Sequence, residues 1–185
     1  MDNQVKIQDL IDSKILTQRK VFLWGEVDDN SAKHVIDRLL YLELLEPGKE
    51  IQLIINSPGG QVTSGFAIYD TMNSITSPIS TICAGLAASM GSIILSAGEK
   101  GRRFVLPNAR VMIHQPSGGA GGPAADIEIQ MDEIIKVKKS GAEILASNCG
   151  QTVDKVMKDF NRDYWMSADE SIEYGIVDGL LDKLI

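Results

Sequence analysis

A repeated alternation of short apolar runs with segments of helical periodicity constrains the fold of this chain more than any other feature. Between residues 21 and 98, each apolar run of strand length is followed by a helical pattern, and turns containing glycine, proline or serine separate them. Strands that alternate with helices in this way are typical of α/β proteins with a parallel sheet. The sequence therefore predicts an α/β fold with a largely parallel sheet, with strands at 21–24, 51–56 and 79–84 and helices at 28–45, 62–75 and 90–98.

The second half of the chain continues the pattern with one unusually long helix. A glycine-rich link, SGGAGGP, opens a helix over about 124–147, in which Ile127, Met131, Ile134 and Ile135 share one face. Ser167 and Glu170 form a capping box for a short helix that Gly175 ends. The remaining predicted elements are strands at 104–106, 110–114 and 176–181 and a helix at 152–160.

The N-terminal segment and the domain organisation are less patterned. Residues 1–20 are mixed and polar, which indicates an arm or a short helix. No internal repeat and no linker divides the chain, so we expect a single domain over residues 1–185.

Charge and composition exclude several classes of function. The formal net charge is −7, whereas nucleic-acid and anionic-membrane surfaces need a basic patch. No uncharged apolar stretch reaches the roughly 18 residues of a membrane-spanning helix, and MDNQVKIQDL does not resemble a signal peptide. The two cysteines are too few for a disulfide scaffold, and we expect Cys83 to fill core space. The expected location is the cytoplasm.

Two glycine-rich turns invite comparison with phosphate-binding loops. INSPGGQVTSG (55–65) and MIHQPSGGAGGPAAD (112–126) each pass from a strand through a glycine turn into a helix. Neither matches G-x-G-x-x-G in the required register, and no G-K-[ST] is present, so we expect no nucleotide site. Glycines can instead leave backbone N–H groups free to bind an oxyanion or an extended peptide.

Ser89 stands alone in LAASMGS, between the apolar strand pattern and the helix that follows. A-A-S-M-G resembles a nucleophile elbow, in which a tight strand-to-helix turn exposes the serine hydroxyl and the helix N-terminus stabilises developing negative charge. The alternative is an ordinary helix N-cap, a position that serine often occupies. This motif alone leaves both interpretations open.

Histidine is the natural general base for a serine nucleophile, and the chain has only two. His34 lies within a charged helical pattern, where we expect it to be solvated. His114 ends a predicted strand beside the glycine-rich link. A histidine at a strand end is often structural, but its coexistence with Ser89 favours a role as base.

A serine–histidine pair needs an acid to orient the imidazole. The sequence offers several, and spacing alone selects none of them. Asp163 lies in NRDYW, beside aromatic side chains that could shield it from water. No paired histidines, C-x-x-C or H-E-x-x-H occur, so we expect no metal site. The candidate acids are Asp126, Asp154, Asp159, Asp163 and Asp178.

Several long motifs occur in one order from about Val21 to Leu181. They are INSPGG (55–60), IYDTM (68–72), STICAGLAASMGS (80–92), LPNARVMIHQPSGG (106–119), DIEI (126–129) and EYGIVD (173–178). On these motifs the chain resembles the ClpP family (peptidase family S14), the proteolytic subunits of the ATP-dependent Clp protease. The resemblance is far more specific than a single elbow motif.

The resemblance implies a serine endopeptidase with a triad in the order Ser, His, Asp. Ser89 falls on the family's nucleophile, His114 on its base and Asp163 on its orienting acid. The backbone N–H groups of Gly60 and Met90 would form the oxyanion hole. The segments that would pair with an extended substrate by strand addition include Gly59, Val62, Pro116, Ser117 and Gly118.

The resemblance also implies an assembly. The fold would be crotonase-like, with a protruding handle helix over about 124–146, and the handles would interdigitate between two stacked heptameric rings. An AAA+ unfoldase of the ClpX, ClpA or ClpC type would feed unfolded proteins into the barrel. Because that partner hydrolyses the ATP, this chain needs no cofactor.

The chain departs from the family pattern at the positions that serve assembly. The family usually has an acidic residue before the arginine that precedes the catalytic acid and helps lock the rings, but here Asn161 precedes Arg162. The unfoldase-docking positions correspond to Gln52, Ile54, Ile82 and Phe104, where many relatives have aromatic residues on the first core strand. The N-terminal arm does not resemble the usual axial loop either. These differences are expected of a divergent paralogue that works with a sister subunit.

Two other classes of function compete with an active peptidase. One is a weakly active scaffold or regulatory subunit of a mixed barrel, which the complete set of Ser89, His114 and Asp163 argues against. The other is a crotonase-type acyl-CoA enzyme of the same fold, for which a serine–histidine pair is unnecessary.

Overall fold

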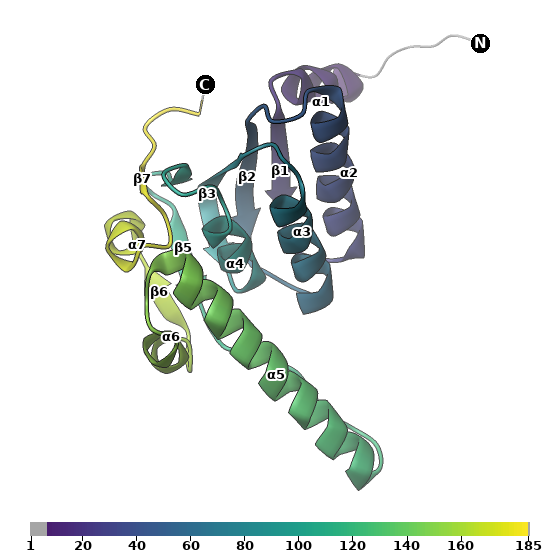
Figure 1. Cartoon of the computed structure of the whole chain (residues 1–185), viewed down its shortest axis with the longest axis vertical. Coiled ribbons are helices and arrows are strands. Elements are labelled where there is room, and N and C mark those ends of the chain that lie inside the picture. The colour runs from purple at the N-terminus through teal and green to yellow at the C-terminus, as the bar shows by residue number, and fades with distance from the viewer. Residues whose placement is uncertain (1–6, 185) are drawn as a thin grey trace, which may run out of the picture.

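The computed structural model describes residues 7–184, which form one mixed sheet with helices packed around it (Figure 1). In chain order the elements are α1 (Ile7–Thr17), β1 (Lys20–Trp24), α2 (Asp29–Leu45), β2 (Ile51–Ser57), α3 (Val62–Ser74), β3 (Ile79–Ala88), α4 (Met90–Ser96), β4 (Arg103–Val105), β5 (Arg110–Ile113), α5 (Ala124–Cys149), α6 (Val153–Asp159), β6 (Tyr164–Met166), α7 (Ala168–Tyr174) and β7 (Gly179–Leu180).

The sheet is mostly parallel, as the alternating pattern predicts. Strands β1, β2, β3, β4 and β7 pair in that order, all in parallel. Strand β5 pairs in parallel with β3, and β6 pairs with β5 in the antiparallel direction. The predicted α/β class is confirmed, and the mixed sheet with its protruding helix agrees with the crotonase-like fold that the resemblance implies.

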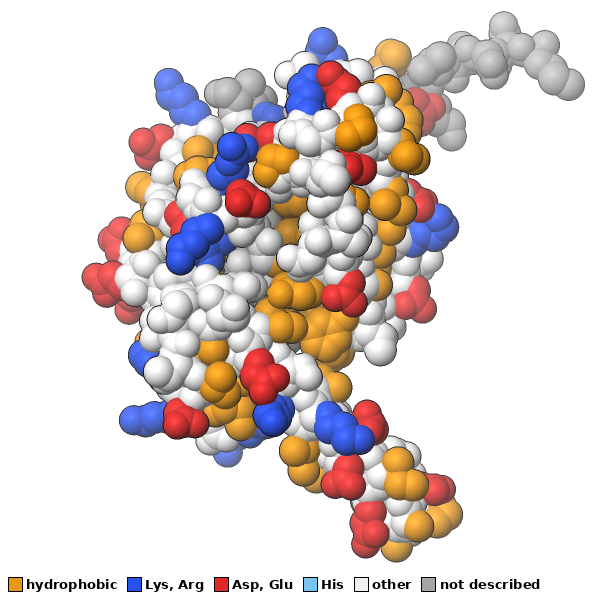
Figure 2. Space-filling model, viewed as in Figure 1, with side chains coloured by type: hydrophobic (Ala, Val, Ile, Leu, Met, Phe, Trp, Pro, Cys, Tyr) orange, Lys and Arg blue, Asp and Glu red, His pale blue; other side chains and the backbone are white. Residues whose placement is uncertain are grey.

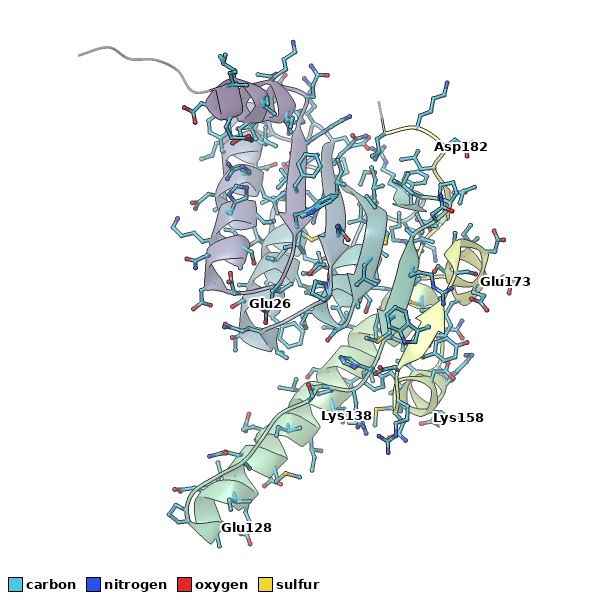
Figure 3. The ribbon with its side chains drawn as sticks, turned by 180° about the vertical axis from the view of Figure 1, so that it is seen from behind. Glu26, Glu128, Lys138, Lys158, Glu173 and Asp182 are labelled. Atoms are coloured by element: carbon cyan, nitrogen blue, oxygen red, sulfur yellow. The ribbon has the colours of Figure 1, made fainter. Side chains whose placement is uncertain are left out.

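Helices cover one face of the strands β1 to β3. Along β1 and β2 the side chains alternate, so that Val21, Leu23, Leu53 and Ile55 are fully buried against the helical layer. Seen from behind in Figure 3, the strands lie in front of α2 and α3, and no helix covers this second face among the residues described. A single helical layer therefore fixes the positions of these strands and of their carboxyl ends.

Strand β3 pairs with two different strands along the same edge. Thr81–Cys83 pair with β4, whereas Leu86–Ala88 pair with β5 on the same edge. Gly85 lies between the two stretches with φ +110°, and a Cβ there would come within 2.8 Å of the Asn56 side-chain oxygen. That oxygen accepts a hydrogen bond from the Leu86 N–H instead. Glycine at this position therefore allows the strand to change partners and extend to Ala88.

Helix α5 leaves the body of the molecule along most of its length (Figure 1). One side of its last two turns is buried, with Ala142 and Leu145 almost fully inaccessible. Its outer half carries apolar side chains on the surface (Figure 2). Ile129 and Ile135 are 63% and 58% exposed. The long predicted helix is confirmed, and it forms an arm whose outer half is bonded to the preceding glycine-rich link through Gln130 and Gly121.

The local signals at the C-terminal end are confirmed in detail. Ser167 and Glu170 form the predicted capping box. Gly175 ends α7 with φ +85°, and a Cβ there would lie 2.4 Å from the Cys149 carbonyl oxygen, so only glycine fits. Cys83 is fully buried in the core, as expected.

The structure corrects three predicted elements. Strand β3 continues to Ala88, beyond the predicted end at residue 84, because pairing with β5 extends it. Strand β6 was not predicted, because Tyr164–Met166 has no strand pattern of its own and exists only through pairing with β5. The predicted strand at 176–181 is reduced to β7, since Ile176 and Val177 pack into the core without a strand partner.

The N-terminal prediction is borne out in its helical form, as α1 at Ile7–Thr17, while residues 1–6 of the predicted arm lie outside the described residues. None of the helices in the described range has the length and hydropathy needed to span a membrane.

Candidate active site

Ser89 occupies a strained turn between β3 and α4. Its φ of +54° and ψ of −123° are uncommon for a residue with a side chain. The backbone holds this conformation, because the Ser89 N–H donates to the Met112 carbonyl at 3.0 Å and its carbonyl accepts from the Ser92 N–H at 3.0 Å. The side chain forms no capping hydrogen bond. The N-cap interpretation of the serine side chain is therefore wrong, and the hydroxyl is left for another use.

The turn after β2 lies directly against Ser89. A Cβ on Gly59 would be 2.6 Å from the Ser89 Cβ and 2.7 Å from the Ala88 carbonyl oxygen. A Cβ on Gly60 would be 2.2 Å from the Val27 carbonyl oxygen. Both residues have positive φ, so the backbone and the close approach each require glycine.

Two backbone N–H groups remain unpaired beside this turn. Val27 holds the loop from both sides, donating to the Gly59 carbonyl at 2.8 Å and accepting from the Gln61 N–H at 2.7 Å. This pattern leaves the Gly60 N–H without an acceptor among the described residues. The Met90 N–H lies in the first turn of α4, where helix N–H groups have no intrahelical partner. The ideal Cβ of Gly59 lies 3.0 Å from the Met90 nitrogen, so the loop and the helix N-terminus adjoin.

His114 follows β5 at the same edge of the sheet. Ala88 and Met112 are paired in the parallel ladder, so the residues after them leave neighbouring strands together. Asp163 precedes β6, and the antiparallel pairing of Ile113 with Tyr164 places the next residues, His114 and Asp163, opposite each other.

The His114–Asp163 pair forms a hydrogen bond of 3.0 Å between Nδ1 and Oδ1. Because a carboxylate can only accept, Nδ1 is the donor in this bond, and in the neutral imidazole Nε2 then carries the lone pair. The Asp163 side chain is 60% exposed, so the prediction that neighbouring aromatics shield it is wrong for the chain by itself. Tyr164 and Trp165 are themselves largely open to solvent.

Ser89 and His114 line the same small cavity. No hydrogen bond joins the Ser89 hydroxyl to the imidazole within residues 7–184. Long serine–histidine contacts are common in sites without bound substrate. The remaining walls are almost wholly apolar, with Val62, Phe66, Met90, Ile93, Pro116, Val137, Gly141 and Phe160.

The cavity includes only some of the predicted substrate-contacting residues. Val62 and Pro116 line it, whereas Ser117 and Gly118 are exposed and lie outside it. Residues 114–121 form neither helix nor strand, so the extended segment expected after His114 is not part of the sheet. It runs against α5, where a Cβ on Gly118 would lie 3.2 Å from Ile134 Cδ1.

The sequence interpretation missed the apolar wall of the cavity. Val62 and Phe66 lie one turn apart on α3, and Val137 and Gly141 lie one turn apart on α5. This spacing indicates a shared face within each helix. It does not indicate that the two faces meet across Ser89.

Asn161 and Arg162 lie in the exposed connection between α6 and β6. The Asn161 carbonyl accepts a hydrogen bond from the Gln115 side chain at 2.9 Å. Arg162 takes part in no ion pair with the described residues of this chain.

The predicted docking positions form a row across the sheet on the face without helices. Ile54 pairs with Ile82 and Ile82 with Phe104 in the strand register. The two isoleucines are almost fully buried in the single chain, and Phe104 is half-buried. Gln52, beside them, has a buried side-chain oxygen without a hydrogen-bond partner.

Other nucleophiles and metal ligands are not assembled in the described residues. No group of three or more His, Cys, Asp or Glu side chains there could hold a metal ion. Burial raises the pKa of both the Cys83 and the Cys149 thiol to about 12, so neither is a thiolate near neutral pH. His34 lies on the surface of α2. Partial desolvation of its ring, together with the charge of Arg38, lowers its pKa.

The comparison with protein families gives one match over nearly the whole chain. The family model described as Clp protease matches residues 3–183. The matched range contains Ser89, His114 and Asp163, together with the loop of Gly59 and Gly60.

Proposed function

The chain belongs to the Clp protease family, and from this membership we propose that it is an active serine endopeptidase subunit that hydrolyses unfolded polypeptides. The observation that carries the proposal is the 3.0 Å hydrogen bond from His114 Nδ1 to Asp163 beside the same cavity that Ser89 lines. Ser89, His114 and Asp163 then act as nucleophile, general base and orienting acid.

In the first half of the reaction, Ser89 Oγ attacks the carbonyl carbon of the scissile peptide bond. His114 Nε2 accepts the hydroxyl proton, and Asp163 stabilises the imidazolium through the Nδ1–H. The tetrahedral intermediate collapses when the imidazolium gives its proton to the leaving amine nitrogen. The amine product leaves and an acyl ester remains on Ser89.

In the second half, water replaces the amine. His114 removes a proton from water, hydroxide adds to the ester carbonyl, and the proton returns to Ser89 Oγ as the carboxylic acid departs. The unpaired N–H groups of Gly60 and Met90 are assigned to the negative oxygen in both intermediates. Loss of one such donor is worth roughly 3 kcal/mol in comparable sites.

The substrate is proposed to bind as an extended strand. Gly59 and Val62 on one side, and Pro116, Ser117 and Gly118 on the other, would provide main-chain hydrogen bonds. Bonds to the main chain do not depend on side-chain identity, which suits a protease of broad sequence preference.

The proposed assembly is a barrel of two stacked heptameric rings, homomeric or mixed with a sister subunit. The exposed apolar side chains on the outer half of α5 support a role as handle between rings. An AAA+ unfoldase of the ClpX, ClpA or ClpC type would dock near Gln52, Ile54, Ile82 and Phe104 and would hydrolyse the ATP. We place the complex in the cytoplasm.

A fluorophosphonate probe tests the nucleophile in the assembled protein. We expect labelling of Ser89 that disappears in Ser89→Ala and persists in Ser147→Ala, which removes an exposed hydroxyl from α5. Absence of labelling in the assembled wild type contradicts the proposal.

The second candidate is a scaffold subunit that depends on a sister subunit for activity. Asn161 in place of an acid favours it, as does Arg162, which forms no ion pair with residues 7–184, because both positions concern contacts between rings. Peptidase assays with and without the sister subunit distinguish the two, since equal activity in both removes the scaffold interpretation.

A further inference from the structure

Gly141 is a glycine that neither the backbone nor the packing of this chain requires. It lies inside α5, where glycine is less favourable than alanine. Gly59, Gly60, Gly85 and Gly175 have positive φ and a close neighbour, but Gly141 has neither. The atom nearest to a Cβ at Gly141 is Ile93 Cδ1 at 3.7 Å, an ordinary contact. The reason for glycine therefore has to be sought in the space beside it.

That space is the cavity of Ser89 and His114. Gly141 is buried and lines the cavity at the point where α5 meets the body, just after Lys138, which is labelled in Figure 3. The side chains around it are all apolar and come from three helices and the end of α6. They are Val62, Phe66, Ile93, Val137 and Phe160.

A Cβ at residue 141 would already be in van der Waals contact with Ile93. A side chain larger than methyl at this position would therefore have to enter the cavity. The missing side chain therefore adds depth to an apolar pocket that adjoins the nucleophile. A pocket whose walls are apolar apart from Ser89 and His114 disfavours charged groups and binds apolar groups in proportion to the surface that they bury.

We propose that Gly141 determines the size of the substrate side chain accepted next to the scissile bond. The proposal rests on the proposed peptidase function. It states that the residue whose carbonyl Ser89 attacks places its side chain in this cavity. The depth left by Gly141 then favours large apolar side chains such as leucine, methionine and phenylalanine over alanine.

The test compares peptides that differ only at that residue, cleaved by the assembled protein. In the wild type we expect kcat/KM for leucine to exceed that for alanine by 10-fold or more, because each methylene in an apolar pocket is worth roughly 10- to 200-fold. In Gly141→Met we expect the leucine-to-alanine ratio to fall at least tenfold. The matched control is Ser140→Met, which adds the same side chain at an exposed neighbouring position and leaves the ratio unchanged.

A second variant keeps the test decisive if Gly141→Met does not assemble. Gly141→Ala adds only the methyl group that the structure accommodates, and it should lower the same ratio about two- to tenfold. Labelling of Ser89 by a fluorophosphonate reports whether the site is formed in each variant. A ratio that stays constant in a labelled Gly141 variant overturns the proposal.

A binding measurement separates this proposal from the peptidase function itself. If the wild type cleaves no peptide, the peptidase proposal fails, and the same peptides are titrated against Ser89→Ala with and without Gly141→Met. Tighter binding of the leucine peptide that is lost with Gly141→Met supports the size determinant independently of catalysis. Equal binding of the leucine and alanine peptides, or no binding of either, overturns it.

Discussion

Two acid–base pairs of this molecule, Arg103–Asp178 and His114–Asp163, show how differently the same kind of contact can be used. The Arg103 and Asp178 side chains are 4% and 18% exposed, whereas those of His114 and Asp163 are 25% and 60% exposed. Asp178 accepts from the Arg103 side chain at 2.9 Å and from two backbone N–H groups, and Arg103 also donates to the Asn148 carbonyl. The buried pair thus joins β4, the end of α5 and the segment before β7.

The exposed pair is left incomplete. His114 uses one ring nitrogen on Asp163, and within residues 7–184 neither its other ring nitrogen nor the carboxylate has a further hydrogen bond. Breaking a buried pair in which every polar group has a partner destabilises the fold, because it leaves one buried charge without its partner. A pair in which one ring nitrogen has no hydrogen bond contributes little to folding but can take part in a reaction. The predictions below test this distinction.

The largest effect is expected from His114→Ala. Removing the general base of a triad lowers kcat by about 10⁶-fold in comparable enzymes. The free energy of unfolding should change by less than about 1 kcal/mol, because the side chain is partly exposed and makes one hydrogen bond. Peptide turnover and thermal unfolding of the assembled protein measure the two quantities. A loss of activity below tenfold would remove His114 from the reaction.

Asp163→Asn should lower kcat by about 10⁴-fold. The side-chain amide can present its NH₂ group to Nδ1, which selects the tautomer with the proton on the wrong nitrogen. The matched control is Asp154→Asn, an exposed acid in the first turn of α6, which should retain activity. Equal activity of both variants would mean that His114 needs no orienting carboxylate.

Asp178→Asn should reduce stability rather than activity per folded subunit. Leaving the buried Arg103 guanidinium unpaired costs about 3–5 kcal/mol, while Glu173→Gln on the exposed side of α7 should stay within about 0.5 kcal/mol. Chemical denaturation measures both variants. A destabilisation below about 1 kcal/mol would show that the pair is dispensable.

The same pair predicts a dependence of stability on pH. Burial alone raises the pKa of the Asp178 carboxyl, but the hydrogen bonds and charge of Arg103 and the Gly101 N–H outweigh it and lower the pKa on balance. Because the folded pKa is depressed, the stabilisation is present above the pKa of the unfolded chain and is lost as the pH falls through the folded pKa. The Asp178→Asn variant should lose this acid-dependent component.

The smallest effect is expected from Glu43→Gln. This carboxylate is fully hydrogen-bonded, as Asp178 is, but it is less buried, so the variant tests the hydrogen bonds apart from burial. The half-buried Glu43 residue accepts hydrogen bonds through its carboxylate from the hydroxyl and N–H groups of Ser77 and Thr76. These bonds lower its pKa from 4.5 to about 2. Its stabilisation is therefore complete above about pH 4.5 and is lost as the pH falls toward 2. The variant should show a flatter stability–pH curve in that window, and an unchanged slope would mean that solvent cancels the bonds.

The local sequence determined the elements that have their own signal. The strand–helix alternation between residues 21 and 98 and the capping box at Ser167 depend on side chains within a few residues of each other. Such features follow from periodicity and capping, which act within one turn or one strand. The same holds for the position of Ser89 between a strand and a helix.

Tertiary structure decided which residues meet. From the residues alone, Asp163 could not be distinguished from four other acids, and only the family resemblance selected it. Its contact with His114, 49 residues away in sequence, depends on the register of β5 with β6. Strand β6 itself has no local pattern and forms only because β5 offers an edge. The apolar wall around Gly141 likewise joins helices α3, α4 and α5 across the cavity.

The sequence by itself determined the order of strands and helices and placed a lone serine and a histidine at the ends of two predicted strands, because hydrophobic periodicity and turn chemistry are local. Only the folded chain decided that the serine side chain is not a cap, that one carboxylate faces the imidazole, and that a glycine in a long helix opens a pocket beside them. These outcomes depend on strand register and on packing between distant segments, and no short stretch of sequence contains that information.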